Sequence, residues 1–533
     1  MNVRIIISIF LFSFCTATLQ AQTIGGDSLK NVQILHARII RLKKQDAGNE
    51  LQILAGNVRL KQENTIFTCD SCVINNSTKV FEAFGNVHIN EDTTNVYSNY
   101  LRYLMNTKKA FLKGNVKLTD GHGVLTTNDL EYDVAGKIGV YKNGGKVVSK
   151  KSVVTSKEGV YYADLHDVYF KRDVELTDPA YYLKSDSLLY NSETQMTRFI
   201  AQTYLRDSSG RTIRTTEGVY NLRSGNANFT QRTTIDDKAT RIVGDQIASD
   251  DSTGLVQILG NGVLIDTAQG VSILANEIFA DRKKEAYLAT RKPLMIIKQD
   301  NDSIYVTADT LFSARLTDRF QAVDSVMNDS TKQVLTKPLP AEKDSTNRYF
   351  EAFRNVRIFS DSVQAVSDSL FYSFQDSTFQ LFRDPLVWTN GSQMKGDTIY
   401  LVTKNKKAER VKLFENSFLI NQLEPGVFNQ VKATRMDGYF TAGAIDSVRA
   451  DGAAESIYYI RDEDSAYSGI NQSSSDMMDV YFQQGDLNKV VFRSNVKGTL
   501  WPASESKRNN LQLKDFEWLE ARRPKTKYEL YDQ

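Results

Sequence analysis

The chain is 533 residues long, and its 66 basic and 64 acidic residues give a formal net charge of +2 at pH 7. Charges of both signs are spread along the whole sequence, which argues against a nucleic-acid partner, because nucleic-acid-binding proteins show a clustered basic face. The four histidines are scattered and the cysteines include no second pair, so the sequence shows no set of four zinc ligands. We therefore expect no metal and no cofactor.

The first 21 residues have the pattern of a cleaved secretory signal. Arg4 supplies a positive charge, a mostly apolar run follows from Ile5 to Phe14, and Ala21 precedes the expected cleavage point. A run of about ten apolar residues is too short to cross ~30 Å of hydrocarbon. We predict a signal peptide at 1–21 and export to the periplasm, in solution or associated with the outer membrane.

A short motif then repeats at intervals of 29 residues. It reads Gly-Asn-Val-x-Leu/Ile at positions 56, 85 and 114, and weaker copies stand at 172 and 354. Thirteen residues after each anchor comes a small or polar pair followed by an apolar residue, as in 98–101 and 185–188. Two signals in fixed phase indicate an array of about fourteen repeat units.

Each unit predicts two long strands joined by short turns. In 109–118 apolar and charged residues alternate, so one face of the strand is dry and the other wet. The glycine or Asx pair in mid-strand marks a bulge or bend. Stacked bent hairpins form two antiparallel sheets that meet along the bends, so we predict an all-β, elongated, V-shaped antiparallel jelly roll. A parallel β-helix has coils of similar length and is the alternative.

One cysteine pair, Cys69-Asp70-Ser71-Cys72, remains once Cys15 is removed with the signal. A redox or metal C-x-x-C motif is one interpretation, but no second cysteine pair or histidine cluster completes a metal site. In the repeat, Cys69 and Cys72 occupy the places of Ser98 and Leu101 in the next unit. We interpret them as structural residues that can form a local disulfide in an oxidising compartment.

The array is interrupted once. Residues 321–347 contain two prolines and little apolar periodicity, which is typical of a flexible linker or loop. We therefore divide the mature chain into repeats at 22–320, this linker, more degenerate repeats at 348–504 and a charged C-terminal tail at 505–533. Leu513, Phe516 and Leu519 have helical spacing, which predicts a short helix that caps the last strand, with a partner-binding tail as the alternative.

The motif Gly-Asn-Val-x-Leu/Ile followed by Ser/Thr-Asn/Asp-x-Leu in an exported β-repeat resembles the OstA-like (organic solvent tolerance, LptA-like) family. The likeness covers residues 50–315 well and 348–500 more loosely. It implies a V-shaped jelly roll, lipopolysaccharide or a related glycolipid passing along its apolar groove, and end-to-end strand pairing with other Lpt-type jelly rolls of the inner and outer membrane. The chain departs from the family by having many more units than a single small bridge protein.

The candidate groove lining consists of the inward apolar residues of the best-preserved units. In a closed sandwich these side chains would simply form the core, and the sequence favours neither interpretation. The candidates are Val58, Leu60, Phe81, Val87, Ile89, Leu112, Val116, Leu118, Val174, Leu176, Val356 and Ile358.

A lipid carrier is the function that these features favour. Each methylene exposed to water costs ~0.8 kcal/mol, and a continuous apolar trough lowers the barrier to moving a lipid. We therefore predict a periplasmic lipopolysaccharide-binding and transport bridge that serves outer-membrane assembly. A secreted β-solenoid scaffold or adhesin without lipid transport is the alternative. A polysaccharide-processing enzyme would need charged groups clustered at one place, whereas Asp129, Asp186 and Asp368 recur at the bends; we predict no catalytic residues.

Overall fold

The computed structural model describes residues 32–44, 50–298, 303–319, 341, 344, 346–404, 407–441, 443–462, 466–483, 486–502 and 511–530. The predicted signal peptide and most of the predicted linker lie outside these residues, and both stay predictions. By its internal contacts the chain divides into two compact units, unit 1 at 1–146 and 160–165 and unit 2 at 147–159 and 166–533. Within the described residues, no helix has the length and apolar character needed to cross a membrane.

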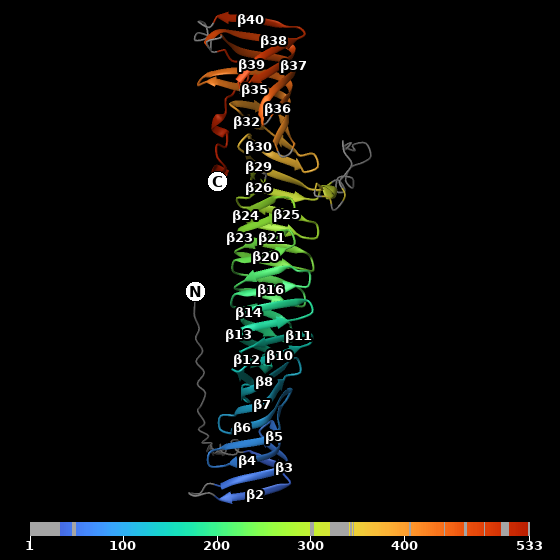
Figure 1. Ribbon diagram of the computed structural model, residues 1–533, viewed down its shortest axis with the longest axis vertical. Coiled ribbons are helices and arrows are strands. Elements are labelled where there is room, and N and C mark those ends of the chain that lie inside the picture. The colour runs from blue at the N-terminus through green and yellow to red at the C-terminus, as the bar shows by residue number, and fades with distance from the viewer. Residues whose placement is uncertain are drawn as a thin grey trace, which may run out of the picture. The chain divides into compact units, whose positions relative to one another are not determined.

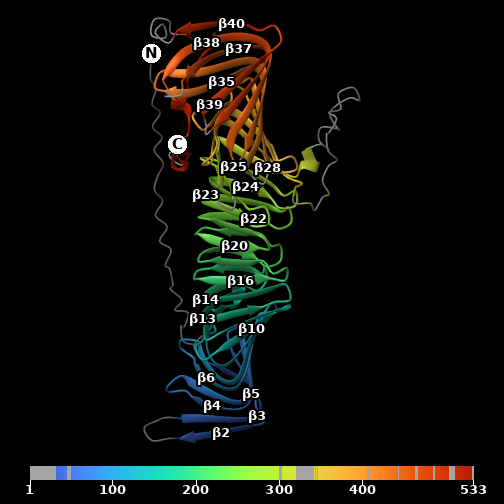
Figure 2. The ribbon, with the colours of Figure 1, turned by 45° about the horizontal axis from the view of Figure 1, so that its top comes forward.

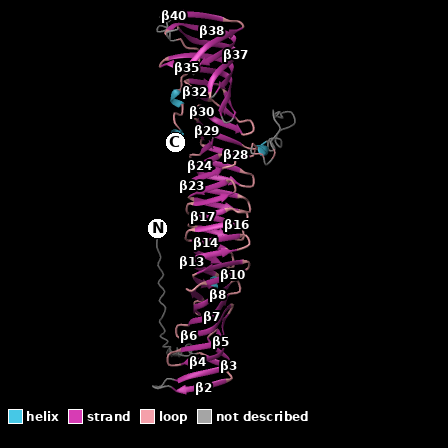
Figure 3. Ribbon diagram, viewed as in Figure 1, coloured by secondary structure: helices cyan, strands magenta, loops and turns pink. Residues whose placement is uncertain are grey.

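Strands make up most of both units, and the helices are single turns (Figure 3). The strands of unit 1 are β1 to β9, at Gln33–His36, Ile39–Lys44, Glu50–Gln62, Thr65–Asn75, Val80–Glu91, Thr94–Leu104, Lys109–Thr119, Val124–Asp133 and Ile138–Tyr141. The strands near the division are β10 to β12, at Gly145–Ser149, Ser152–Ser156 and Glu158–Tyr162, followed by a 3-10 turn, η3, at Ala163–Leu165.

The strands of unit 2 are β13 to β40. The first sixteen lie at Asp167–Thr177, Tyr181–Asn191, Met196–Phe199, Thr203–Asp207, Thr212–Thr215, Gly218–Asn221, Ala227–Phe229, Thr233–Asp237, Thr240–Gly244, Gln246–Asp250, Leu255–Asp266, Val271–Asp281, Ala286–Thr290, Leu294–Lys298, Ser303–Thr307 and Thr310–Ala314. The last twelve lie at Tyr349–Phe359, Gln364–Ser373, Thr378–Phe382, Leu386–Thr389, Ser392–Lys395, Thr398–Lys404, Lys407–Glu424, Val427–Thr441, Ala444–Arg461, Tyr467–Gln483, Asp486–Arg493 and Lys497–Pro502. Two 3-10 turns, η6 at Glu520–Arg522 and η7 at Lys527–Leu530, follow them.

Each long strand pairs antiparallel with the strand that follows it in its hairpin, and the short strands pair antiparallel within their own arm, which confirms the jelly roll over the parallel β-helix. In unit 1, β4 to β8 form a continuous meander. In unit 2 the strands lie one above another in chain order (Figure 1). The register of each long hairpin breaks in mid-strand, as between Phe84 and Val87, and the hairpins of β35 to β38 have a second break near a strand end. The break divides the hairpin into a first arm, which holds 80–84 and 100–104, and a second arm, which holds 87–91 and 94–98.

Two consecutive residues with left-handed backbone make most of the corners between the arms. Gly85 has φ 70° and Asn86 has φ 43°, conformations that glycine adopts freely and asparagine tolerates. Asn86 Nδ2 also donates a 2.9 Å hydrogen bond to Asp70 Oδ2 on the preceding strand. The same bond joins Asn261 to Asp245 at 2.7 Å. At these corners the asparagine of the anchor motif therefore binds the aspartate of the preceding polar pair.

The small or polar pair thirteen residues after each anchor also contributes to the corner, through a buried hydroxyl group. Ser98 is buried and its Oγ donates a 3.0 Å hydrogen bond to the carbonyl oxygen of Tyr100, across the corner of its own strand. Thr127, Ser185 and Ser367 make the same bond two residues along. The two signals keep a fixed phase because they are the two halves of one corner.

The C-terminal segment 511–530, which we call the C-terminal strap, packs on the outer face of the second arm of unit 2. Figures 1 and 2 show it in red beside the strands that run from β35 toward β29. Leu513 packs with the outward side chains of Phe418 and Ile420. Gln430 accepts a 2.9 Å bond from the Leu513 backbone N–H and donates a 3.2 Å bond to the Leu511 carbonyl oxygen. The strap thereby covers an outer face that would otherwise expose apolar side chains.

The short helix predicted from Leu513, Phe516 and Leu519 is wrong. These residues precede η6, and helical structure in the strap is limited to the two 3-10 turns. Their side chains contact different strands, because Leu513 lies in the cluster with Phe418, whereas Leu519 packs against Trp388. An extended segment can follow successive strands, which a helix could not do.

Replacing the corner glycine tests this account of the bend. A Cβ at Gly85 would lie 2.3 Å from Asp70 Oδ2, whereas one at Gly121, whose φ is also positive, would meet nothing within 4 Å. We expect Gly85→Ala to lower the free energy of unfolding of unit 1 by about 2–3 kcal/mol, since it adds a clash to the strain, and Gly121→Ala by about 1 kcal/mol. Urea unfolding monitored by tyrosine fluorescence measures both. Equal losses would contradict the proposed role of the corner.

Truncating a strap side chain tests whether the strap stabilises unit 2. Leu513 is buried, and Leu513→Ala is expected to lower the free energy of unfolding of unit 2 by about 2–3 kcal/mol, because it leaves a cavity against Phe418 and Ile420. The neighbouring Lys514→Ala, at an exposed position, is the control and should change it by less than about 0.5 kcal/mol. If the two variants unfold alike, the strap does not stabilise this face.

Candidate functional site

All twelve predicted lining residues lie on the inner faces of the two arms. The first eight are in unit 1 and Val174, Leu176, Val356 and Ile358 are in unit 2; each is at most 5% exposed. In unit 1 the arms touch directly, since the rings of Phe67 on the second arm and Phe81 on the first arm have centroids 5.2 Å apart. The space between the arms is therefore filled by the chain's own side chains at these positions, and contact with a lipid stays a prediction.

A ladder of large side chains fills the first arm near the open side of the V. Cross-strand pairing joins Phe81 to Tyr103 in unit 1 and Phe350 to Tyr372 in unit 2. In unit 2 the same ladder also contains Tyr190, Tyr220 and Tyr287, and all the aromatic members except Tyr287 are at most 6% exposed. Large aromatic rings at this position explain why most of the interior is closed.

On four consecutive strands of this ladder in unit 2, the side chains are small instead of aromatic. Between Tyr220 and Tyr287, cross-strand pairing passes through Ala227, Ser249, Val256 and Ala280. A cavity of about 330 Å³ lies at this place, walled by Ser249, Val256 and Ala280 of the first arm and by Ile213, Ile235 and Ile242 of the second. We call it the mouth cavity, because the turns that border the open side of the V also line it. The loss of aromatic residues at a fixed repeat position is visible in the sequence and could have indicated this cavity. The predicted lining residues were chosen without it.

Polar contacts join the two arms across the open side of the V. In unit 1, Lys108 Nζ lies 2.5 Å from Glu63 Oε2, and Lys137 Nζ lies 3.3 Å from Asp92 Oδ2. Each pair links a turn of the first arm to a turn of the second. These contacts close the mouth of the V, and the sequence interpretation did not predict them.

Unit 2 carries the most buried of these contacts. Arg211 Nη1 and Nη2 donate to the two carboxylate oxygens of Asp251 at 2.8 and 2.7 Å, and Arg282 Nη2 donates to the same carboxylate at 2.5 Å. Burial raises the pKa of the Asp251 carboxyl, but the bonds and charges of Arg211 and Arg282 outweigh this effect and leave the pKa below its usual range. The hydrogen bonds to Asp251 raise the pKa of the Arg211 guanidinium, which stays charged. One carboxylate thus holds two cations beside the mouth cavity.

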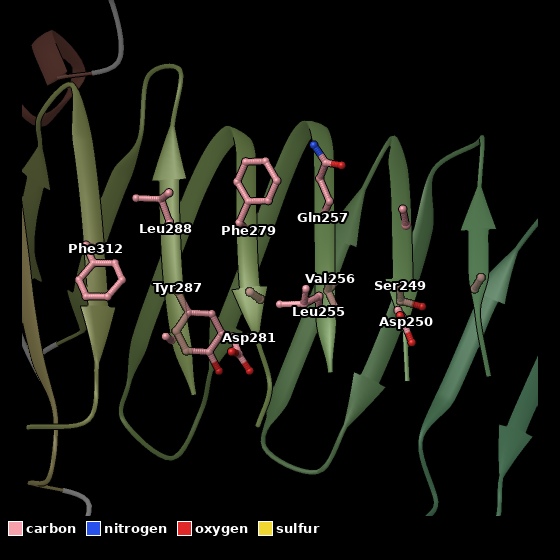
Figure 4. Close-up of a pocket in the computed structure, with 14 residues that line it drawn as sticks. Ser249, Asp250, Leu255, Val256, Gln257, Phe279, Asp281, Tyr287, Leu288 and Phe312 are labelled. Carbon is pink, nitrogen blue, oxygen red and sulfur yellow. The ribbon is translucent and has the colours of Figure 1, made fainter. Parts of the chain in front are cut away.

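A second, shallow hollow of about 490 Å³ lies on the outer face of β22 to β28 (Figure 4). Gln257, Phe279, Leu288 and Phe312 are successive cross-strand neighbours and lie in a row in the figure. Phe279 is 41% exposed. The sequence interpretation treated the outer face as polar and did not predict this apolar surface.

The two cysteines are buried, as expected for structural residues, and the structure holds them as free thiols. The thiol hydrogen bond between them and burial raise the pKa of Cys72, and the bond to Cys72 lowers the pKa of Cys69. The local disulfide stays a prediction. Within the described ranges, no three His, Cys, Asp or Glu side chains come together as a metal site.

Comparison with known proteins supports the family resemblance. The model of the family described as OstA-like protein matches residues 29–186, so this part of the chain is OstA-like. Among solved structures, the chain is similar to LptH from Pseudomonas aeruginosa, the LptA-homologous periplasmic component of the lipopolysaccharide transport device. That similarity has 11% identity and a TM-score of 0.13, and covers 25% of this chain and 79% of LptH. No curated protein matches the chain.

The Asp251 contact predicts a pH-dependent stability. Because the folded pKa of Asp251 is lowered, its stabilisation is complete above the ordinary carboxyl pKa of about 3.9 and is lost as the pH falls through the folded pKa. Asp251→Asn should lower the free energy of unfolding of unit 2 by about 2–3 kcal/mol at pH 7 and flatten its decline below pH 4, since Arg211 then keeps only Asp207 and Arg282 loses its carboxylate partner. Thermal melting between pH 3 and 7 measures this. Asp237→Asn, at the same mouth, is the control and should leave both quantities nearly unchanged.

Proposed function

We propose that the protein binds a lipopolysaccharide-type glycolipid between its two arms and passes it along the repeats toward the outer membrane. The repetition of one inward apolar pattern in both units, with corners of the same geometry, is the observation that carries this proposal. Neighbouring positions then offer similar apolar surroundings to an acyl chain, so a ligand meets no single deep well. The OstA-like match over residues 29–186 supports the same function.

The packed interior determines how a lipid would enter. An acyl chain gains ~0.8 kcal/mol for each methylene it buries, but the inner side chains fill the space until the arms separate. Polar contacts such as Lys108 with Glu63 lie partly exposed at the mouth, and exposed ion pairs contribute only about 0–1 kcal/mol each. A chain of several methylenes therefore gains more free energy than such contacts contribute, and we infer that the lipid itself opens the mouth.

End-to-end strand pairing is the second part of the proposal. In unit 1, β2 pairs with β3 on one side, and its Ile39, Ile40 and Leu42 are 48%, 55% and 68% exposed. An apolar edge strand either aggregates or pairs with a partner strand. We propose that this edge receives a strand of another Lpt-type jelly roll, in the periplasm or at the outer membrane.

A structural scaffold without lipid transport is the second candidate. The complete burial of the twelve inward residues favours it, because a filled interior needs no ligand. In that case the repeats form a dry core, and the apolar edge of unit 1 serves only for assembly. Neither candidate uses a catalytic group, and we propose no enzymatic activity.

Site-specific photocrosslinking distinguishes the two candidates. A diazirine amino acid at Val116, which faces inward, should crosslink lipopolysaccharide in cells, whereas the same group at the outward, exposed Lys117 should not. Val87→Asp should abolish the copurification of lipid from the periplasm, because burying a carboxylate against acyl chains is unfavourable. Circular dichroism checks that the variant folds. A folded protein that is free of lipid and crosslinks equally from both positions would establish the scaffold instead.

A further inference from the structure

We infer that the mouth cavity of unit 2 is a distinct binding site for a single acyl chain that carries a phosphate or carboxylate head group. This inference rests on the proposed lipid function and names the site and the ligand class. Its basis is the combination of an apolar interior, an interruption of the aromatic ladder and a polar rim with unused donors. No predicted lining residue belongs to this cavity.

The interior of the cavity suits a hydrocarbon chain. Ile213, Ile235 and Ile242 form one wall, and Val256 and Ala280 contribute to the other. Its volume of about 330 Å³ lies at the lower end of the range for ligand pockets. It therefore takes one chain, and a lipid with several acyl chains would leave the others outside it.

The absence of aromatic rings makes this place different from the rest of the array. Tyr220 and Tyr287 mark the ends of the gap in the ladder, and Ser249 lies within it. In unit 1 the corresponding ladder contains Phe81, Tyr103 and Tyr132, which close the interior. An apolar wall with room beside it has lost packing contacts that a ligand would restore.

The rim of the cavity is polar, and the Asp251 carboxylate that binds Arg211 and Arg282 lies beside it. Arg211, Lys238, Arg282 and Arg348 lie there with Asp237, Asp266 and Glu285.

Two of the acidic side chains are already engaged. Glu285 Oε2 accepts from Arg348 Nη1 at 3.4 Å, and Asp266 Oδ1 accepts from the backbone N–H groups of Ala268 and Gln269 at 3.0 and 3.1 Å. These bonds reduce the number of acceptors that compete for a cation at the rim.

Two basic groups retain donors for an anion. Arg282 Nε is buried and has no hydrogen-bond partner among the described residues. Lys238 makes no ion pair within the described part of the chain, and its exposed side chain stands at the turn opposite Arg282 in the cavity lining. A phosphate or carboxylate accepts charge-assisted bonds from such donors, so a head group at the rim satisfies a donor that the protein leaves unpaired.

Binding of single-chain amphiphiles to the mature protein tests the site. The probes are dodecyl phosphate, dodecyl maltoside and dodecyltrimethylammonium below their micelle concentrations, with inorganic phosphate alone as a fourth probe, all measured by isothermal titration calorimetry. We expect dodecyl phosphate to bind at one site per chain and more tightly than the other three. Equal binding of the cationic probe, or phosphate binding without a chain, would overturn the inference.

Variants assign the binding to the mouth cavity. Ser249→Tyr places in the gap the residue type that the ladder carries at Tyr220, and it should abolish dodecyl phosphate binding. Arg282→Gln combined with Lys238→Gln should weaken dodecyl phosphate at least about tenfold and leave dodecyl maltoside unchanged. Lys284→Gln, an exposed position on the same turn and outside the cavity lining, is the matched charge control. If Ser249→Tyr lowers the melting temperature, Ala280→Val replaces it as the filling variant.

Unchanged binding in folded Ser249→Tyr or Ala280→Val would overturn the site. Repeating the titration with lysophosphatidic acid and with a monophosphorylated lipid A tells a glycerophospholipid from a glycolipid source. The outcome is independent of the crosslinking experiment: lipopolysaccharide crosslinks from Val116 without binding here refute the cavity only, whereas dodecyl phosphate binding here without those crosslinks refutes the transport function only.

Discussion

The bond between a left-handed asparagine and an aspartate on the preceding strand is the interaction on which the rest of the structure depends. Asn86 bends its own strand and at the same time clasps Asp70 on the strand before it. Without this bond, nothing would offset the strain of the two left-handed residues, and polar groups at the break in the strand pairing would have no partners. Because the same bond recurs at Asn261, Asn355 and Asn495, successive hairpins bend at the same place and their arms lie in two facing sheets.

Facing sheets bring the inner residues into contact and make the interior sensitive to side-chain size. Aromatic rings close it, as Phe81 and Tyr103 do in unit 1, and small residues open it, as Ser249 and Ala280 do in unit 2. The corners thus set a constant frame, and the local choice of side chain decides whether that frame holds a dry core or a cavity. Polar contacts at the open side, such as Arg211 with Asp251, add an electrostatic closure that the corners do not supply.

The outer face is apolar in two places, of which the C-terminal strap covers one. On the second arm of unit 2, the outward Phe418 and Ile420 are buried because the C-terminal strap packs on them. Gln393 and Gln430 bind strap backbone groups with both their donor and acceptor, so an irregular segment keeps its hydrogen bonds. On the first arm, Phe279 and Leu288 line an exposed hollow that the described residues leave uncovered.

The sequence alone determined the features that depend on local conformation. The repeat period, the mid-strand bend and the inward face follow from residue spacing, since strand alternation and left-handed backbone are properties of a few neighbouring residues, and the structure confirms them at Gly85, Asn86 and Val87. Tertiary structure alone decided which turns meet across the mouth, because residues such as Arg211 and Asp251 are 40 positions apart. It also decided that Leu513, Phe516 and Leu519 lie in an extended strap: helical spacing is a weak local preference, and burial against β32 to β38 outweighs it.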